Sequence, residues 1–296
     1  MNRQQPIGCI LMGGLGNQLF QIFTTIAHAI KHNRPFVFSS TKAEGTQHLG
    51  FPRPTYWDNF LKQLSGNTTS IEVLQAIRNV EGLRYIETLH EYIEIPPPLK
   101  DKPQILTGYF ESYKYFEPYF VAIYNMLKLD VTREKSIKIL SPYRPATIIS
   151  LHMRRGDNVA KKNTGYHRLL DDKYYIDAVK ILLSKINKPK KDILIMCFTE
   201  PTDRQYRDDF IIKAKEELNI ECIPPPPTIT TDYDELMTMS SCDHHVISAS
   251  TFSWWAAYIN KSPNKLVVYP TPWFGPKNSH LDTSSKCPDS WISLQC

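Results

Sequence analysis

Residues 147–157 read TIISLHMRRGD, an apolar run of strand length that ends in a charged turn. A short, continuously apolar run is typical of a strand that is buried on both faces of a parallel sheet. After it, apolar strands alternate with amphipathic helices, which indicates a doubly wound α/β domain. We predict strands at residues 147–153, 193–198, 220–223, 244–248 and 265–269, and helices at residues 173–186, 203–218, 234–240 and 252–260.

The first half of the chain is less regular. Residues 141–145 (SPYRP) predict a linker, because prolines disfavour both helices and strands. We therefore expect an N-terminal α/β domain over residues 1–143 and a C-terminal one over residues 144–296. In the N-terminal domain we predict strands at residues 7–12, 36–39 and 104–108, helices at residues 19–30, after a glycine loop, and at residues 113–127, and an irregular segment at residues 41–100.

Composition excludes several classes of protein. The chain has 296 residues with 35 basic and 30 acidic side chains, a net charge of +5, which is too mild for a dedicated nucleic-acid binder. Apolar runs such as residues 193–198 and 254–259 have six residues, and no run is longer, whereas roughly 20 residues are needed to span a membrane. We expect a soluble, cytoplasmic protein with no membrane span.

The charged turn after residues 147–153 is the strongest local signal of a site. His152, Arg154 and Arg155 end a predicted strand at the carboxyl edge of the sheet, where α/β proteins bind ligands. Arginine suits planar, bidentate contacts to phosphate oxygens. The alternative is structural, with one arginine paired to Asp157 and the other in solvent.

Two further segments pair a predicted strand with a helix start. In GGLGNQ, residues 13–18, Gly14 and Gly16 permit a ligand to approach the backbone near a helix N-terminus, but the spacing is neither GxGxxG nor a P-loop. In SASTFSWW, residues 248–255, Ser250 and Thr251 either cap a helix or bind a phosphate, and Phe252 packs on a base or in the core. A tight turn and a capped helix are the structural alternatives.

A third pattern, Asp232-Tyr233-Asp234, fits the D-x-D metal site of nucleotide-sugar enzymes. It also lies directly before a predicted helix, where aspartate is a common cap. A metal-dependent glycosyltransferase with another donor is therefore one alternative function. A non-catalytic protein that binds a nucleotide or glycan is the other.

Three segments in this order resemble the α-1,2-fucosyltransferases of glycosyltransferase family 11: GGLGNQLFQ, HMRRGD and DELMTMSSCDHHVISASTFSWWAAYI. The resemblance spans roughly residues 8–276. It implies a GT-B-like fold of two Rossmann-type domains, with the acceptor on the N-terminal domain, the nucleotide sugar on the C-terminal domain and the donor site in the cleft. It also implies GDP-β-L-fucose as donor, a glycan acceptor, an α-1,2-linked product formed with inversion, and no cofactor or metal.

The resemblance also assigns site residues. Arg154 and Arg155 would hold the β-phosphate, and His152 would line the nucleotide pocket. The remaining donor and acceptor contacts would come from Gly14, Gly16, Asn17, Asp203, Ser250, Thr251 and Phe252. Two positions depart from the family pattern: Ala249 replaces the usual asparagine, and Thr199-Glu200-Pro201-Thr202-Asp203 replaces a Ser-Asp-Asp type sequence.

The chemistry requires displacement at an anomeric carbon with GDP as the leaving group. Negative charge grows on the β-phosphate, so fixed arginines would bind the transition state better than the ground state. Asn17 and Asp157 complete the expected catalytic set. Asp157 is either the base that takes the acceptor proton or a residue that orients an arginine, since two adjacent cations depress the pKa of a carboxyl group.

Overall fold

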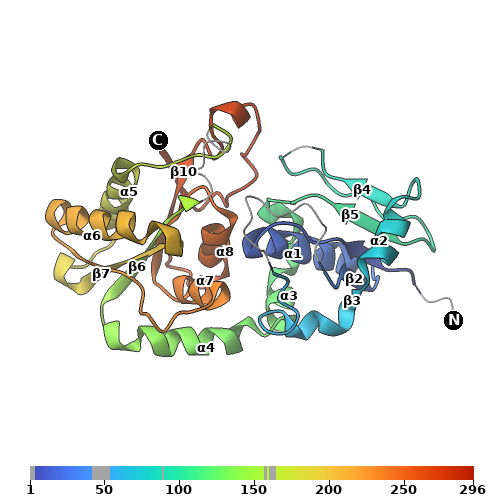
Figure 1. Ribbon diagram of the computed structural model, residues 1–296, viewed down its shortest axis with the longest axis horizontal. Coiled ribbons are helices and arrows are strands. Elements are labelled where there is room, and N and C mark those ends of the chain that lie inside the picture. The colour runs from blue at the N-terminus through green and yellow to red at the C-terminus, as the bar shows by residue number, and fades with distance from the viewer. Residues whose placement is uncertain (1–3, 42–53, 89, 157–158, 160–164) are drawn as a thin grey trace. The chain divides into compact units, whose positions relative to one another are not determined.

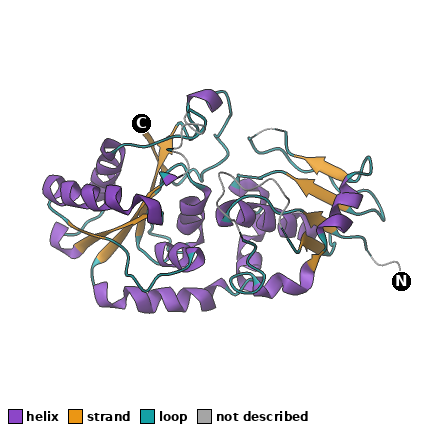
Figure 2. Cartoon of the chain, viewed as in Figure 1, coloured by secondary structure: helices purple, strands orange, loops and turns teal. Residues whose placement is uncertain are grey.

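The computed structural model describes residues 4–41, 54–88, 90–156, 159 and 165–296. These residues form two compact units, each built around its own parallel sheet (Figures 1 and 2). The first unit comprises the chain up to Thr132 together with Leu281–Pro288, and the second comprises Arg133–His280 and Asp289–Cys296. None of the described helices is long and apolar enough to cross a membrane.

The chain passes from the first unit to the second inside helix α4 (Leu129–Leu140), before the SPYRP sequence on which we based a boundary at residue 143. Leu129 is fully buried. From the next turn on, α4 bonds to the second unit: Arg133 Nε donates to Ser241 Oγ at 3.3 Å and Lys135 Nζ lies 2.7 Å from Asp234 Oδ2. These polar contacts assign most of α4 to the second unit.

The sheet of the first unit has the strand order β3-β2-β1-β5-β4, and all its pairings are parallel. Helices α1 and α3 contact each other, and α2 packs against β5. The elements are β1 (Ile7–Cys9), α1 (Leu15–Lys31), β2 (Phe36–Ser39), β3 (Thr68–Thr69), α2 (Ile71–Arg78), β4 (Arg84–Ile86), β5 (Gln104–Thr107) and α3 (Phe120–Met126).

The helix predicted over residues 113–127 is wrong. Two short 3₁₀ turns, Tyr113–Tyr115 and Glu117–Tyr119, precede α3. Pro118 contributes to the break, because it supplies no N–H for a helical bond to the preceding turn and is tolerated only in the first turn of a helix, which is where it stands in the second 3₁₀ turn. Phe116, which separates the two turns, has a φ of −135°, outside the helical range.

The sheet of the second unit has the order β11-β10-β9-β6-β7-β8, again entirely parallel. When the six strands are numbered from 1 at β6 and the sheet is read from the β8 edge, this is the order 3-2-1-4-5-6 of a Rossmann fold. The elements are β6 (Thr147–Met153), α5 (Asp172–Lys185), β7 (Ile193–Thr199), α6 (Arg204–Leu218), β8 (Glu221–Ile223), α7 (Asp232–Ser240), β9 (His244–Val246), α8 (Thr251–Ile259), β10 (Val267–Thr271) and β11 (Ile292–Gln295).

Helices cover both faces of this second sheet. Helices α5 and α6 contact each other on one side, and α7 packs against α8 on the other (Figure 1). Every residue of β6 and β7 is buried, as the continuous apolar pattern predicted. The doubly wound arrangement predicted for the second half of the chain is confirmed.

Candidate functional site

The site is built where the strand order of the second sheet reverses. From β6 the chain proceeds to β7 and β8 on one side, whereas β9, β10 and β11 extend on the other. The helices that follow β6 and β9 leave toward opposite faces, so a crevice forms beyond the carboxyl ends of these two neighbouring strands. The HMRRGD segment ends β6, and the SASTFSWW segment follows β9. The topology therefore brings the two predicted donor-binding segments to one edge.

His152 links the two segments. Its Nδ1 lies 2.9 Å from Ser248 Oγ, and its ring centre lies 5.7 Å from that of Phe252. The side chain is only 3% exposed. Burial, with a smaller repulsion from Arg154, lowers the pKa of His152 to about 3. The imidazole is therefore neutral near pH 7 and serves the site through hydrogen bonding and ring contacts, not through charge.

This buried imidazole makes stability depend on pH. Between pH 6.5 and pH 3, His152 is protonated in the unfolded chain but not in the folded one. The contribution of His152 to the free energy of unfolding is therefore complete above pH 6.5 and declines as the pH falls below it. The shift predicts a loss of about 2 kcal/mol from this group between pH 7 and pH 5. Urea unfolding of the wild type and His152→Gln at both pH values measures it. An equal loss in the two proteins would contradict the prediction.

Arg154 forms an ion pair with Glu200, which the sequence analysis did not foresee. The register contains the signal: β6 pairs with β7 so that Met153 lies opposite Thr199, which places the next residues of both strands side by side. The Arg154 side chain is 17% exposed and the Glu200 side chain 30% exposed. A phosphate that binds Arg154 would therefore compete with the partly exposed Glu200 carboxylate for the guanidinium.

The turn after Arg155 depends on glycine. Gly156 has a φ of +37°, and a Cβ there would clash with the Glu200 carboxylate. Its N–H donates to Asp203 Oδ2 at 2.6 Å. Asp203, which we predicted as a donor contact, thus holds the backbone of the arginine turn. Asp157, the other carboxylate predicted here, lies outside the described residues.

Arg155 has a different environment from Arg154. Its Cζ lies 3.8 Å from the centre of the Tyr206 ring, a cation–π contact. Tyr206 Oη in turn donates to Asp172 Oδ1 at 2.6 Å. The pairing with Asp157 in the structural alternative lies outside the described residues, and the contacts that the structure does describe are those of Arg155 with the Tyr206 ring and of Arg154 with Glu200.

Helix α8 presents its N-terminus at the same edge. Ser250 occupies the N-cap with extended backbone angles, as predicted. Ser250 and the first turn are both described, yet the Ser250 hydroxyl accepts no hydrogen bond from that turn. Backbone N–H groups at a helix start and the positive end of its dipole favour anions. Ser250, Thr251 and Phe252 are all half-buried, so this end of the helix is accessible.

The Asp232-Tyr233-Asp234 pattern lies in the first turn of α7. The cap is Thr231, whose hydroxyl accepts from the N–H of Asp234 at 3.1 Å, so the aspartate cap that we considered is wrong. Asp234 is buried and paired with the Lys135 ammonium. Within the described ranges, no group of three or more His, Cys, Asp and Glu side chains is arranged to hold a metal ion.

The predicted residues of the N-terminal half belong to the first unit. Gly14 is the N-cap of α1, and Gly16 and Asn17 lie in its first turn, beyond the carboxyl end of β1. Gly13 has a φ of +74°, and a Cβ there would lie 2.6 Å from Asn17 Nδ2. Gln18 Nε2 donates to the Gly13 carbonyl at 3.0 Å. The glycine loop is thus a tight turn that the side chain of Gln18 in α1 stabilises, and it lies at the carboxyl edge of the first sheet.

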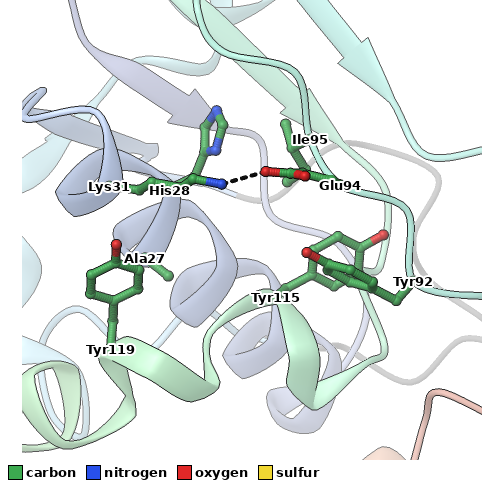
Figure 3. Close-up of a pocket in the computed structure, with 8 residues that line it drawn as sticks. All are labelled: Ala27, His28, Lys31, Tyr92, Glu94, Ile95, Tyr115 and Tyr119. Atoms are coloured by element: carbon green, nitrogen blue, oxygen red, sulfur yellow. Dashed lines mark hydrogen bonds and ion pairs between the residues drawn. The ribbon is translucent and has the colours of Figure 1, made fainter.

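A pocket in the first unit lies at the other end of α1, near Lys31 (Figure 3). Among the lining residues, Lys31 Nζ and Glu94 Oε1 are 2.5 Å apart, and the ring centres of Tyr92 and Tyr115 are 4.9 Å apart. His28, which also lines it, contacts Gln104 at the start of β5. The pocket therefore adjoins the amino ends of the strands and is separate from the glycine loop.

Comparison with known proteins gives a consistent set of relatives. The model of "Glycosyl transferase family 11" matches residues 58–292. An alpha-1,2-colitosyltransferase of Escherichia coli is 23% identical over 307 residues, which cover 96% of this chain and 97% of the relative. A galactoside 2-alpha-L-fucosyltransferase of Caenorhabditis elegans is 25% identical over 277 residues, which cover 84% of this chain and 66% of the relative.

The fold also has a counterpart among solved structures. A crystal structure of POFUT1 in complex with GDP superposes with a TM-score of 0.52 at 13% identity, covering 91% of this chain and 98% of the other. A likeness at this identity concerns the fold. It confirms the GT-B-like architecture of two α/β units that the resemblance implied, whereas a donor site in a cleft between the units stays a prediction.

Proposed function

This chain belongs to glycosyltransferase family 11, and from that premise we propose that it transfers L-fucose from GDP-β-L-fucose to O-2 of a galactoside, with inversion. The observation that carries the proposal is the cluster at the β6–β9 edge. Arg154, Arg155 and the N-terminus of α8 supply positive charge there, beside the neutral imidazole of His152. A nucleoside diphosphate is the ligand class that fits this cluster.

The proposed chemistry follows from the charge that develops. The bond between the anomeric carbon and the β-phosphate oxygen breaks through an oxocarbenium-like transition state, as in glycoside hydrolysis. Negative charge then accumulates on the phosphate that Arg154 and Arg155 face. Cations already fixed in place stabilise this charge without reorganising. The acceptor hydroxyl attacks from the opposite face of the sugar and loses its proton, to a base that we leave unassigned.

We expect the reaction to need no metal ion. The charge that a metal would supply is provided in this proposal by the guanidinium groups and by the helix N-terminus. Asp234, half of the alternative metal site, already neutralises Lys135 at 2.7 Å. A cation at Asp232 and Asp234 would have to displace that ammonium.

The test is incubation with GDP-fucose and a panel of β-galactosides, in EDTA and in Mn²⁺, followed by linkage analysis. We expect an α-1,2-fucoside at equal rates under both conditions. Strict Mn²⁺ dependence would favour the metal-dependent alternative. A protein that binds GDP but neither transfers fucose nor hydrolyses the donor would favour the non-catalytic one.

A second donor belongs in the same assay. The relative that aligns with 96% of this chain is named a colitosyltransferase, so GDP-colitose is the competing sugar nucleotide. Both donors place the same diphosphate on Arg154 and Arg155, and they differ in the sugar alone. The ratio of kcat/KM for the two donors assigns the substrate, and we expect GDP-fucose to be preferred.

A further inference from the structure

Tyr206 lies beneath Arg155 in a way that leaves the arginine available to a ligand. Arg155 Cζ is 3.8 Å from the ring centre. The ring contact and a side-chain hydrogen bond to Tyr206 use only part of the guanidinium, which carries five N–H donors, so donors remain for the oxygen atoms of a ligand. The ring is also neutral. It therefore does not compete with a phosphate as the Glu200 carboxylate beside Arg154 does.

A second layer fixes the tyrosine ring. Tyr206 Oη donates to Asp172 Oδ1 at 2.6 Å, and Lys213 Nζ lies 2.8 Å from Asp172 Oδ2. Tyr206 and Lys213 are seven residues apart on α6, so they share one face of that helix, whereas Asp172 begins α5. The phenol is thus bonded at its far end to a different helix. The ring also packs against the hydrophobic core of the second unit.

Charge strengthens this arrangement. Burial by itself would raise the pKa of Asp172, but the bonds from Lys213 and Tyr206 and the nearby charges of Lys213 and Arg155 lower it below its usual value. The carboxylate is therefore ionised at neutral pH and accepts the phenolic proton. Burial and this bond together raise the pKa of Tyr206, so the phenol remains a donor.

We propose that Tyr206, held by Asp172, is a positioning residue that sets the side chain of Arg155 for the diphosphate of the donor. Arginine is long and flexible, and a contact held before the ligand arrives reduces the conformational freedom that binding would otherwise remove. This inference rests on the proposed function, because it assumes that Arg155 meets a diphosphate. Arg155 makes the ligand contact, and Tyr206 acts through it.

The first measurement is the affinity for GDP by calorimetry, which requires neither acceptor nor turnover. Tyr206→Leu removes the ring face, and we expect the dissociation constant to rise about 3- to 30-fold, the range of a cation–π contact. Tyr206→Phe keeps the ring face but loses the bond to Asp172, and Asp172→Asn weakens the same bond. Both variants should therefore fall between the wild type and Tyr206→Leu. The matched control for Asp172→Asn is Asp177→Asn, which removes the acid of the exposed Lys173–Asp177 pair on the same helix and should change nothing.

A double-mutant cycle separates positioning from general support of the fold. If Tyr206 acts through Arg155, Tyr206→Leu has no further effect on GDP affinity in an Arg155→Ala background, although it still lowers the melting temperature there. An equal loss of affinity in both backgrounds would show a merely structural role and overturn the inference. So would GDP affinity that is unchanged in Tyr206→Leu.

The two proposals fail differently. If the wild-type protein transfers fucose and binds GDP, and the Tyr206 variants bind GDP with the same affinity as the wild type, only the positioning role is contradicted. A wild-type protein that binds no GDP removes the proposed function, and this inference with it.

Discussion

Arg154→Ala is expected to lower kcat about 10²- to 10³-fold, the usual cost of removing one fixed group that stabilises developing charge. The side chain lies at the carboxyl end of β6, largely buried and held by Glu200. Because its interaction with the phosphate strengthens as the glycosidic bond breaks, kcat should fall more than KM for the donor rises. Steady-state kinetics with GDP-fucose as the varied substrate measures both.

Two further variants sharpen this prediction. Arg154→Lys keeps the charge but loses the bidentate geometry, so it should recover part of the activity. Lys180→Ala removes the cation of the exposed Lys180–Glu217 ion pair in the same unit, and its kcat and KM should match those of the wild type. A melting temperature close to that of the wild type shows that the Arg154 variant is folded. Activity of Arg154→Ala within a factor of a few of wild type would rule out the role.

Trp254→Ala is expected to reduce the free energy of unfolding by about 3–5 kcal/mol, as other truncations of buried tryptophan do. Trp254 is fully buried in α8, and its ring centre lies 4.6 Å from that of Tyr258 and 5.5 Å from that of Trp291. A domain is stable by only about 5–15 kcal/mol. The variant should therefore be marginal, and the helix that presents its N-terminus to the donor should lose its support.

Urea unfolding followed by circular dichroism gives the value. The matched control is Ile212→Ala on α6, which truncates an apolar side chain that is 62% exposed and should cost less than about 0.5 kcal/mol. A loss below about 1 kcal/mol in Trp254→Ala would contradict the packing described for α8.

The centre of the second unit was predictable from sequence because β6 and β7 have seven residues each and are fully buried. Most of their residues are apolar, so pattern and structure agree there to within a residue, whereas β11, with alternating exposed and half-buried residues, was not predicted. That HMRRGD and STFSWW lie at the same edge of one sheet also followed, since each ends or follows a strand of one parallel sheet. What the pattern did not give was the strand order, and with it the reversal at β6 and β9.

The first unit was less predictable, for physical reasons. Strand β3 has two residues and β4 alternates exposed and half-buried side chains at a sheet edge, so neither has a continuous apolar pattern. Residues 113–127 have helical spacing, but Pro118 contributes to a break in it. At the site, Glu200 and Tyr206 were missed as partners of the arginines. Both follow β7, and their proximity depends on the pairing of β7 with β6, which the sequence does not state.

The most direct test of the account is a crystal structure of the protein with GDP. We expect the diphosphate beyond the carboxyl ends of β6 and β9, with N–H groups of Arg154 and Arg155 within about 3 Å of β-phosphate oxygens and the N-terminus of α8 directed at the same group. GDP bound elsewhere, or bound with both arginine side chains turned away from it, would contradict the central claim.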